Sequence, residues 1–145
     1  MDVAEFVRRY QRAWESRSSE AFGDLWHDDG VLEHPMLSRA IRGSSVAAFN
    51  QLNVATLPDL EWNLLSWASL DRVVFLEWQC SAHINEARVT WTGVDKLTLR
   101  DGRIEREVVF SDTLPLWTAL DPTMGRDAPI NADQIEAGTQ SGGGS

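Results

Sequence analysis

The stretch Arg88-Val-Thr-Trp-Thr-Gly-Val-Asp-Lys-Leu-Thr-Leu99 alternates with a period of two, which predicts a β-strand with one face in a core. Successive side chains of a strand point to opposite faces of the sheet, so the apolar row reads Val89, Trp91, Gly93, Asp95, Leu97 and Leu99. Asp95 is the exception in this row. Burying an ionised carboxylate without partners costs on the order of several kcal/mol. Asp95 is therefore either a structural residue whose hydrogen bonds are satisfied or a pocket residue with a shifted pKa.

Neighbouring segments share this period of two. We expect long strands at about 60–69, 72–84, 88–100 and 103–114. The links between them are Leu70-Asp71-Arg72, Asn85-Glu86-Ala87 and Asp101-Gly102, of which the first and last are typical of compact hairpins. Together these segments predict an antiparallel meander.

The chain before the meander has a helical period instead. Apolar residues at three- and four-residue spacing predict a helix over Val3–Ser16, a short second helix that begins at Ser18-Ser19, and a third that follows Gly43 and ends near Leu57. Between them, 27–30 is predicted as a turn and 31–35 as a short strand. We therefore predict an α+β fold, in which three N-terminal helices cover one face of a curved, mostly antiparallel sheet and form a cone around a cavity.

Charge and cysteine content restrict the partners. The chain has 145 residues, of which 43% are hydrophobic, enough for one domain with its own core. A net charge of −9 and a pI near 4.7 argue against nucleic acid and membrane surfaces, which attract clustered Lys and Arg. The single cysteine, Cys80, excludes an intrachain disulfide and is compatible with a reducing compartment. The sequence has no apolar signal core or membrane-spanning stretch, so we expect a cytoplasmic protein.

The composition changes after Leu120 to proline, glycine, aspartate and alanine. We assign residues 1–120 to the domain and predict that residues 121–145 form a flexible tail. The closing Ser-Gly-Gly-Gly-Ser is typical of an engineered linker and is left out of the fold prediction.

Tryptophan is unusually frequent, and each indole combines a large apolar body with one N–H donor that suits a core or a ligand pocket. The seven are Trp14, Trp26, Trp62, Trp67, Trp78, Trp91 and Trp117. Trp78 and Trp91 lie on inward strand faces and are the better pocket candidates. With them we name Trp14, Phe49 and Cys80 as candidate substrate-binding residues. Cys80 lies in the inward row of Trp78 and is expected to pack as a small apolar side chain.

Five motifs share an order along the chain: Val7-Arg-Arg-Tyr-Gln-Arg-Ala-Trp14, Leu25-Trp-His-Asp-Asp-Gly-Val-Leu-Glu-His-Pro35, Ile41-Arg-Gly43, Gly93-Val-Asp95, and Asp101-Gly-Arg-Ile104 leading to Phe110-Ser-Asp112. The set, which covers roughly residues 2–118, resembles the nuclear-transport-factor-2-like superfamily. That superfamily includes SnoaL-like polyketide cyclases, limonene-epoxide hydrolases, scytalone dehydratase and ketosteroid isomerase. The resemblance implies the cone fold, which hosts many chemistries and also proteins that are not enzymes.

Ketosteroid isomerase is the closest chemical comparison. The resemblance places Tyr10 at its oxyanion-hole tyrosine, Asp95 at its protonated aspartic acid, and His34 at its general-base aspartate. The base differs, because His34 stands where that enzyme has an aspartate.

The residues themselves allow this chemistry. Tyr10 lies on the apolar stripe of the first helix, so its hydroxyl needs an internal partner. His34 ends a strand beside a proline and is expected at the pocket rim with a pKa of about 6.5. Tyr10 and a neutral Asp95 would stabilise an enolate oxygen while His34 moves the proton. The alternatives are a core tyrosine, an Asp95 bonded to Tyr10 or a tryptophan N–H for structure alone, and a His34 that bonds the backbone.

The last strand leaves its orientation open. Its two rows are both mixed, and a β-bulge would exchange them. Either Ser111 or Asp112 can face the cavity, and the resemblance favours Asp112 as a fourth candidate catalytic residue after His34, Tyr10 and Asp95.

We expect an isomerase, cyclase or lyase that moves protons on a small apolar, carbonyl-bearing ring compound without a cofactor or a metal. The sequence contains no His/Cys/Asp cluster with metal-ligand spacing and no glycine-rich phosphate loop. The alternative is a non-catalytic protein that binds a small hydrophobic ligand in the same cavity. The mixed outer strand faces, 75–83 and 90–98, favour a homodimer.

Overall fold

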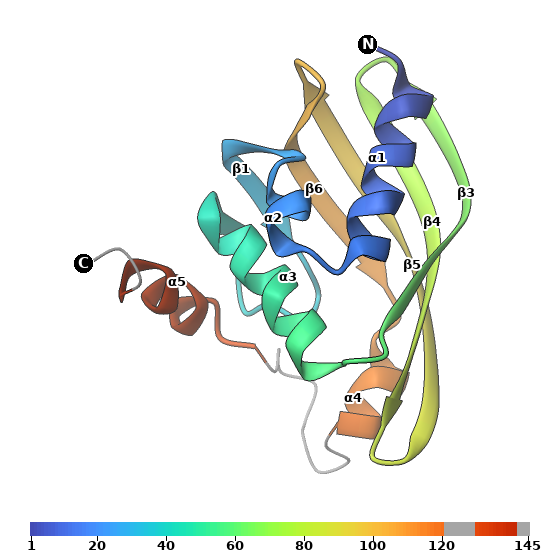
Figure 1. The fold of residues 1–145 in the computed structure, drawn as a ribbon, viewed down its shortest axis with the longest axis vertical. Helices are drawn as coiled ribbons and strands as arrows, with labels where there is room; N and C mark the ends of the chain where they lie inside the picture. Colours follow the sequence, from blue (N-terminus) through green and yellow to red (C-terminus); the bar gives the residue numbers. More distant parts are fainter. Residues whose placement is uncertain (121–129, 142–145) are drawn as a thin grey trace.

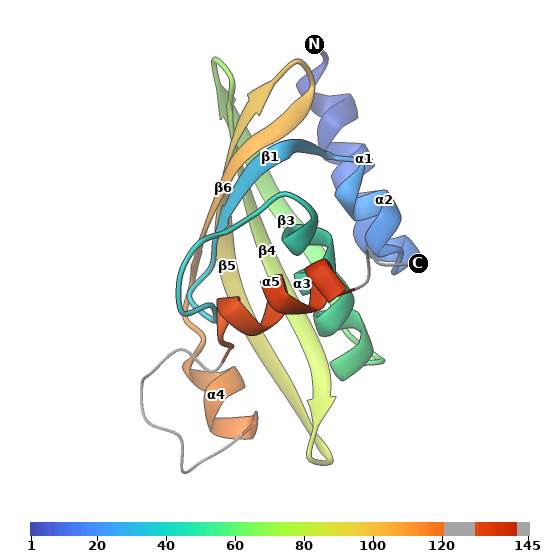
Figure 2. The ribbon, with the colours of Figure 1, turned by 90° about the vertical axis from the view of Figure 1, so that its left-hand side faces the viewer.

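Six strands form one curved sheet in the computed structural model, which describes residues 1–120 and 130–141. Their order across the sheet is β2 (Ile41–Arg42), β1 (Trp26–Glu33), β6 (Arg103–Ser111), β5 (Ala87–Arg100), β4 (Val73–Ile84) and β3 (Glu61–Leu70). All neighbours are antiparallel except β1 and β6, which are parallel. Helices α1 (Val3–Ser16), α2 (Ser19–Gly23) and α3 (Ser44–Thr56) cover one face (Figures 1 and 2). The predicted α+β cone is confirmed.

Helix α1 is held at both ends. The Asp2 side chain accepts a hydrogen bond from the Glu5 backbone N–H at its start, and Arg17 ends it in the left-handed conformation. The Arg17 guanidinium then donates to the backbone carbonyls of Val54, Leu57 and Leu60. These bonds tie the end of α1 to the end of α3, so the two helices keep a fixed separation above the sheet.

Tight turns join the strands of the meander as predicted. Asp71, Asn85, Glu86, Asp101 and Gly102 all have positive φ angles between 50° and 74°. Hairpin turns need this left-handed backbone, which Gly, Asn and Asp adopt at the lowest cost.

A bulge in β6 decides which of its side chains face the cavity. Thr98 pairs with Arg106 while Leu99 pairs with Ile104, so Glu105 is an extra residue in the ladder. Beyond this bulge the inward residues are Glu107 and Val109, which are 3% and 8% exposed. The bulge therefore places a second carboxylate on the inner face of the sheet.

Two local predictions for β1 and β6 were wrong. Residues 27–30, predicted as a turn, belong to β1, where the register against β6 shifts between Trp26 and Val31 and absorbs the extra residues. The last strand ends at Ser111 because Asp112 accepts a bond from the Leu114 backbone N–H and starts α4 (Leu114–Leu120). A side chain used as a helix cap interrupts the ladder at that point.

The prediction of a flexible tail from residue 121 was wrong for the part that the structure describes there. Helix α5 (Ala132–Ser141) contacts α3, as Figure 2 shows, and Ile130 bridges to Leu37 in parallel. Arg39 forms ion pairs with Asp133 and Glu136, and Ala132 is fully buried. The rest of the tail, 121–129 and 142–145, lies outside the described residues.

None of the helices in residues 1–120 and 130–141 has the length and apolar character needed to cross a membrane.

Candidate functional site

A cavity of about 240 Å³ lies between the sheet and the helices. Its walls are largely apolar, with both aromatic and aliphatic side chains, and include all five predicted substrate-binding residues, Trp14, Phe49, Trp78, Cys80 and Trp91. Leu52 and Leu120 line it and are also exposed, so the entrance lies between the ends of α3 and α4. A concave, apolar space with a few polar groups is the usual form of a small-molecule site.

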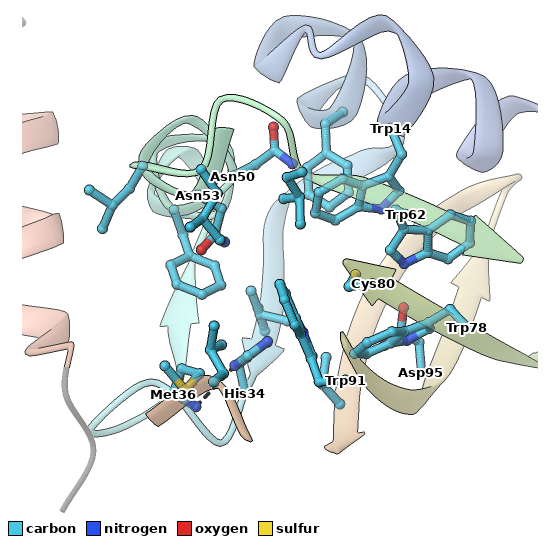
Figure 3. A pocket seen from close by; sticks show the side chains of 18 of the residues that line it. Trp14, His34, Met36, Asn50, Asn53, Trp62, Trp78, Cys80, Trp91 and Asp95 are labelled. Atoms are coloured by element: carbon cyan, nitrogen blue, oxygen red, sulfur yellow. Dashed lines mark hydrogen bonds between the residues drawn. The ribbon is translucent and has the colours of Figure 1, made fainter. Parts of the chain in front are cut away.

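Three of the four predicted catalytic residues, Tyr10, His34 and Asp95, line this cavity. Figure 3 shows Asp95 beside Trp78 and Cys80 on one side of the space, and His34 beside Met36 on another. Tyr10 and Asp95 are in direct contact, whereas the side chain of His34 is bonded to neither of them.

Asp95 accepts two hydrogen bonds inside the protein. Its Oδ1 lies 2.8 Å from Trp78 Nε1 and its Oδ2 lies 3.0 Å from the Tyr10 hydroxyl. The same hydroxyl lies 3.1 Å from Oε1 of Glu107. A phenol has one proton and cannot donate to both carboxyls, so one of the two must itself carry a proton.

Glu107 is the carboxyl that holds this proton. Burial and the charge of Asp95 raise the pKa of Glu107 well above its ordinary value. Its Oε2 is buried and has no hydrogen-bond partner among the described residues, whereas its Oε1 faces the Tyr10 hydroxyl. This fits a proton on Oε1 that is donated to the Tyr10 oxygen, while the Tyr10 hydroxyl donates to Asp95. The hydrogen bonds from Trp78 and Tyr10 lower the pKa of Asp95 instead. Asp95 is therefore the ionised member of the pair at neutral pH.

The pair titrates far from the ordinary range of carboxyl groups. Burial raises the pKa of Asp95 to about 6, even with the hydrogen bonds from Trp78 and Tyr10 that stabilise its charged form. Burial and the two nearby carboxyls also raise the pKa of Tyr10 well above its ordinary value, so the phenol stays neutral. This differs from the prediction for Asp95, because the neutral donor of the site is Glu107 and Asp95 is the acceptor.

Sequence reasoning did not select Glu107. The residue appears in one of the two mixed rows of the last strand, and nothing local says which row faces inward. Only the bulge at Glu105 and the pairing of Leu97 with Glu107 place it beside Asp95. The available signal was a carboxylate two positions before Val109 in a possible inward row.

Gly93 makes room for the Trp78 indole. A Cβ at Gly93 would lie 2.4 Å from the six-membered ring of Trp78 and 2.8 Å from the Phe110 carbonyl oxygen. The two residues are paired across β4 and β5, and Asp95 follows two positions along the same face. The missing side chain lets the indole lie close enough to β5 for its N–H to reach Asp95.

His34 is part-exposed and lines the cavity, but it does not have the ordinary pKa that we expected. Its ring packs edge-on against Phe49 at a centroid distance of 5.2 Å, and burial lowers its pKa to about 4. Its Nδ1 accepts a hydrogen bond of 3.0 Å from the Met36 backbone N–H. A neutral imidazole that accepts at Nδ1 carries its proton on Nε2. The ring therefore presents an N–H donor, and the lone pair that a general base needs is already engaged.

Asp112, the fourth predicted catalytic residue, does not line the cavity. Its side chain is exposed and caps α4. Ser111, the alternative, donates to the Thr92 carbonyl at 2.6 Å and does not line the cavity either. The bulge in β6 and the end of the strand at Ser111 explain why both residues lie away from the site.

The apolar walls have further features that the sequence did not show. Trp62, which we had not selected, stacks on Trp14 with ring centroids 6.1 Å apart and planes at 7°. Burial raises the pKa of the Cys80 thiol, which therefore stays protonated. Nowhere in residues 1–120 and 130–141 do three His, Cys, Asp or Glu side chains gather to hold a metal ion.

Comparisons with known proteins agree with this fold. A family model described as a SnoaL-like domain matches residues 7–107. No curated protein matches the sequence.

Solved structures match over most of the chain. AclR from Streptomyces galilaeus is 17% identical, with a TM-score of 0.70 over 83% of this chain and 96% of its own. TerC, co-crystallised with polyporic acid, is 17% identical, with a TM-score of 0.72 over 81% and 97%. An LEH-like epoxide hydrolase from M. tuberculosis is 19% identical, with a TM-score of 0.66 over 80% and 86%. The chain therefore belongs to the SnoaL-like domain family, within the nuclear-transport-factor-2-like superfamily.

Proposed function

We propose that this protein is an isomerase, cyclase or lyase that moves a proton on a small apolar ring compound with a carbonyl group. The observation that carries the proposal is the Asp95–Glu107 pair, which holds one proton at the wall of an apolar cavity. Perturbed pKa values in a cavity are typical of acid–base catalysts. The SnoaL-like family and neighbours such as TerC with polyporic acid and the LEH-like epoxide hydrolase support a reaction on a small organic molecule.

The Asp95–Glu107 pair can take part in both steps of a proton transfer, the removal of a proton from carbon and its return to another atom. The Asp95 carboxylate takes a proton from a carbon next to the substrate carbonyl, and the electron pair of that C–H bond moves to the carbonyl oxygen as an enolate. A proton then returns from the pair to a different atom of the enolate, which completes an isomerisation or starts a ring closure. Tyr10 and Trp78 keep the Asp95 carboxylate in one orientation throughout.

A pKa of about 6 suits this task. Asp95 is then mostly ionised at pH 7 and is a stronger base than an exposed aspartate. His34 has a different role in this scheme, because its accessible ring nitrogen is a donor and its pKa of about 4 keeps it neutral.

Hydrogen–deuterium exchange on a cyclic ketone tests the proposal. The protein is incubated with 2-tetralone in D₂O, and loss of the protons next to the carbonyl is followed by NMR. D95N removes the acceptor at nearly constant shape, and the enzyme-dependent rate should fall by about 10²–10⁴-fold. The matched control is D112N, the same change on an exposed carboxylate outside the cavity. Exchange that persists in both D95N and E107Q would refute the proposal.

A second candidate function is ligand binding without turnover. It is favoured by the hydrogen bonds of Asp95, because both of its oxygens already have donors without any substrate. In that case D95N would weaken the fold but leave ligand affinity nearly unchanged, and the wild type would not exchange protons of any ketone tested.

We also propose that two copies of the chain pair through the outer face of the sheet. Phe75 and Phe110 are 38% and 58% exposed there; Phe110 is paired with Val94, and Phe75 and Val108 are both paired with Lys96. Exposed aromatic side chains on one continuous sheet face are typical of a surface that is covered by a partner.

A further inference from the structure

We infer that the wall made by His34 and α3 is an oxygen-binding subsite, and that the substrate is a one- or two-ring compound with a second oxygen remote from the carbon that loses its proton. The inference rests on the proposed function only for the position of that carbon beside Asp95. The subsite itself rests on the donors of the wall and on the size of the cavity.

His34 supplies a fixed donor at this wall. The Met36 backbone N–H occupies Nδ1, so the ring proton is on Nε2. No described residue accepts a hydrogen bond from Nε2, and the ring lines the cavity. A donor that is held in one orientation and has no acceptor among residues 1–120 and 130–141 is suited to a ligand oxygen.

Asn50 supplies the second polar group. It belongs to α3, lines the cavity and is only 4% exposed, yet its carboxamide makes no hydrogen bond with any described residue. The Asn50 amide is not among the fully buried unpaired atoms of the described residues, so its donor and acceptor are open to the cavity that it lines. Asn53 lies one helical turn further on and lines the same space. The chain keeps two amides where apolar side chains would pack better, so a ligand group that bonds them explains their presence.

The subsite lies away from the carboxyl pair. Figure 3 shows His34, Asn50 and Asn53 on one side of the cavity, and Asp95 with Trp78 on the opposite side. Trp91 lies between the two groups in this view. A ligand that fills the space therefore presents one edge to Asp95 and the other edge to the subsite.

Charge decides which kind of oxygen fits. Among the residues that line the cavity in the described chain, none is lysine or arginine. Asp95 adds a negative charge, so a carboxylate or phosphate on the ligand would be repelled and would have no counter-ion. The second oxygen is therefore a neutral hydroxyl or carbonyl oxygen.

Volume limits the size of the ligand. An apolar cavity of about 150 Å³ in another protein holds benzene, with its six non-hydrogen atoms. By the same ratio a cavity of about 240 Å³ holds about ten. This is the size of two fused six-membered rings, and a four-ring skeleton would have to extend out through the entrance.

Paired ketones provide the test. Binding of 2-tetralone and of 6-hydroxy-2-tetralone is measured by calorimetry on the full chain; the second compound adds one hydroxyl on the ring remote from the ketone. One neutral hydrogen bond corresponds to about a tenfold change in Kd, so the hydroxy compound should bind wild type about tenfold more tightly. N50L and H34F should each reduce that preference, which is measured as the ratio of the two Kd values within the same variant. The matched control is N63L, on an exposed residue of β3.

The outcomes separate this inference from the proposed function. Equal affinity for the two ketones in wild type, no binding of either, a preference that survives in both N50L and H34F, or tighter binding of a four-ring steroid ketone would each overturn it. Loss of the preference in N50L without any proton exchange would support the subsite and refute the enzyme. Proton exchange that depends on Asp95, without tighter binding of the hydroxy compound, would support the enzyme and refute the subsite.

Discussion

Replacing Trp78 with phenylalanine tests how the cavity controls its carboxyl pair. W78F keeps an aromatic ring over Gly93 but removes the N–H that lies 2.8 Å from Asp95 Oδ1. A hydrogen bond to a charged group contributes about 1.5–3 kcal/mol, and a tenfold change in proton affinity corresponds to about 1.4 kcal/mol. The ionised form of Asp95 therefore loses enough stabilisation to move its titration upward by about one to two pH units.

The sign of the effect on activity follows from the role of the base. Proton abstraction needs ionised Asp95, so the rate falls as the pH drops through its pKa of about 6. In W78F the midpoint of this acid limb should move to about pH 7–8, with a smaller change in the rate at high pH. The assay is the pH dependence of proton exchange on 2-tetralone, measured between pH 5 and 9.

The matched control is W117F. It removes a hydrogen bond of the same length, 2.8 Å, which Nε1 of Trp117 in α4 donates to Thr113 Oγ1. It should leave the acid limb in place, because Thr113 has no contact with the pair. A limb that stays near pH 6 in W78F, or that moves equally in W117F, would refute the argument that the Trp78 N–H stabilises the Asp95 charge.

Three further predictions concern stability and assembly. The pKa of Glu107 is raised in the fold, so its contribution to stability is lost as the pH rises above the ordinary carboxyl range. E107Q cannot titrate and should remove this loss. The Tm of E107Q should therefore exceed that of wild type at pH 8–9 but not at pH 5. G93A should cost about 1–3 kcal/mol of unfolding free energy and change the tryptophan emission, since its Cβ collides with Trp78. G138A, in α5, where the new Cβ meets no atom within 4 Å, should instead stabilise the helix or be neutral, and equal effects of the two changes in denaturant titration would contradict the collision. F110S, on the outer sheet face, should shift a dimer towards monomer in light scattering, and an unchanged mass would argue against pairing through that face.

Local pattern predicted most of the architecture. The period of two in 88–99 placed Asp95 inward, and the structure finds it 3% exposed. Hairpin residues such as Asp71 and Gly102 marked the turns because aspartate and glycine adopt positive φ angles at low cost. The helical spacing in α1 brought Tyr10 inward by the same logic.

Longer-range contacts decided what the pattern left open. Helix α5 is held by the ion pairs of Arg39 with Asp133 and Glu136, which are more than ninety residues away in the chain. The composition of the tail carries no sign of a partner at that distance. Likewise the pKa of His34 depends on the apolar residues around its ring, and its tautomer depends on Met36, whose backbone direction is set by the loop after β1.

The sequence by itself therefore determined a cone with Tyr10 and Asp95 inside it, because alternation and helical spacing are properties of neighbouring residues. Only the tertiary structure decided that Asp95 shares its site with Glu107 and that His34 is a donor. The physical reason is that one bulge exchanges the two faces of β6, and a bulge is defined by the pairing of two strands. Proton positions in the cavity follow from hydrogen bonds and burial contributed by distant parts of the chain.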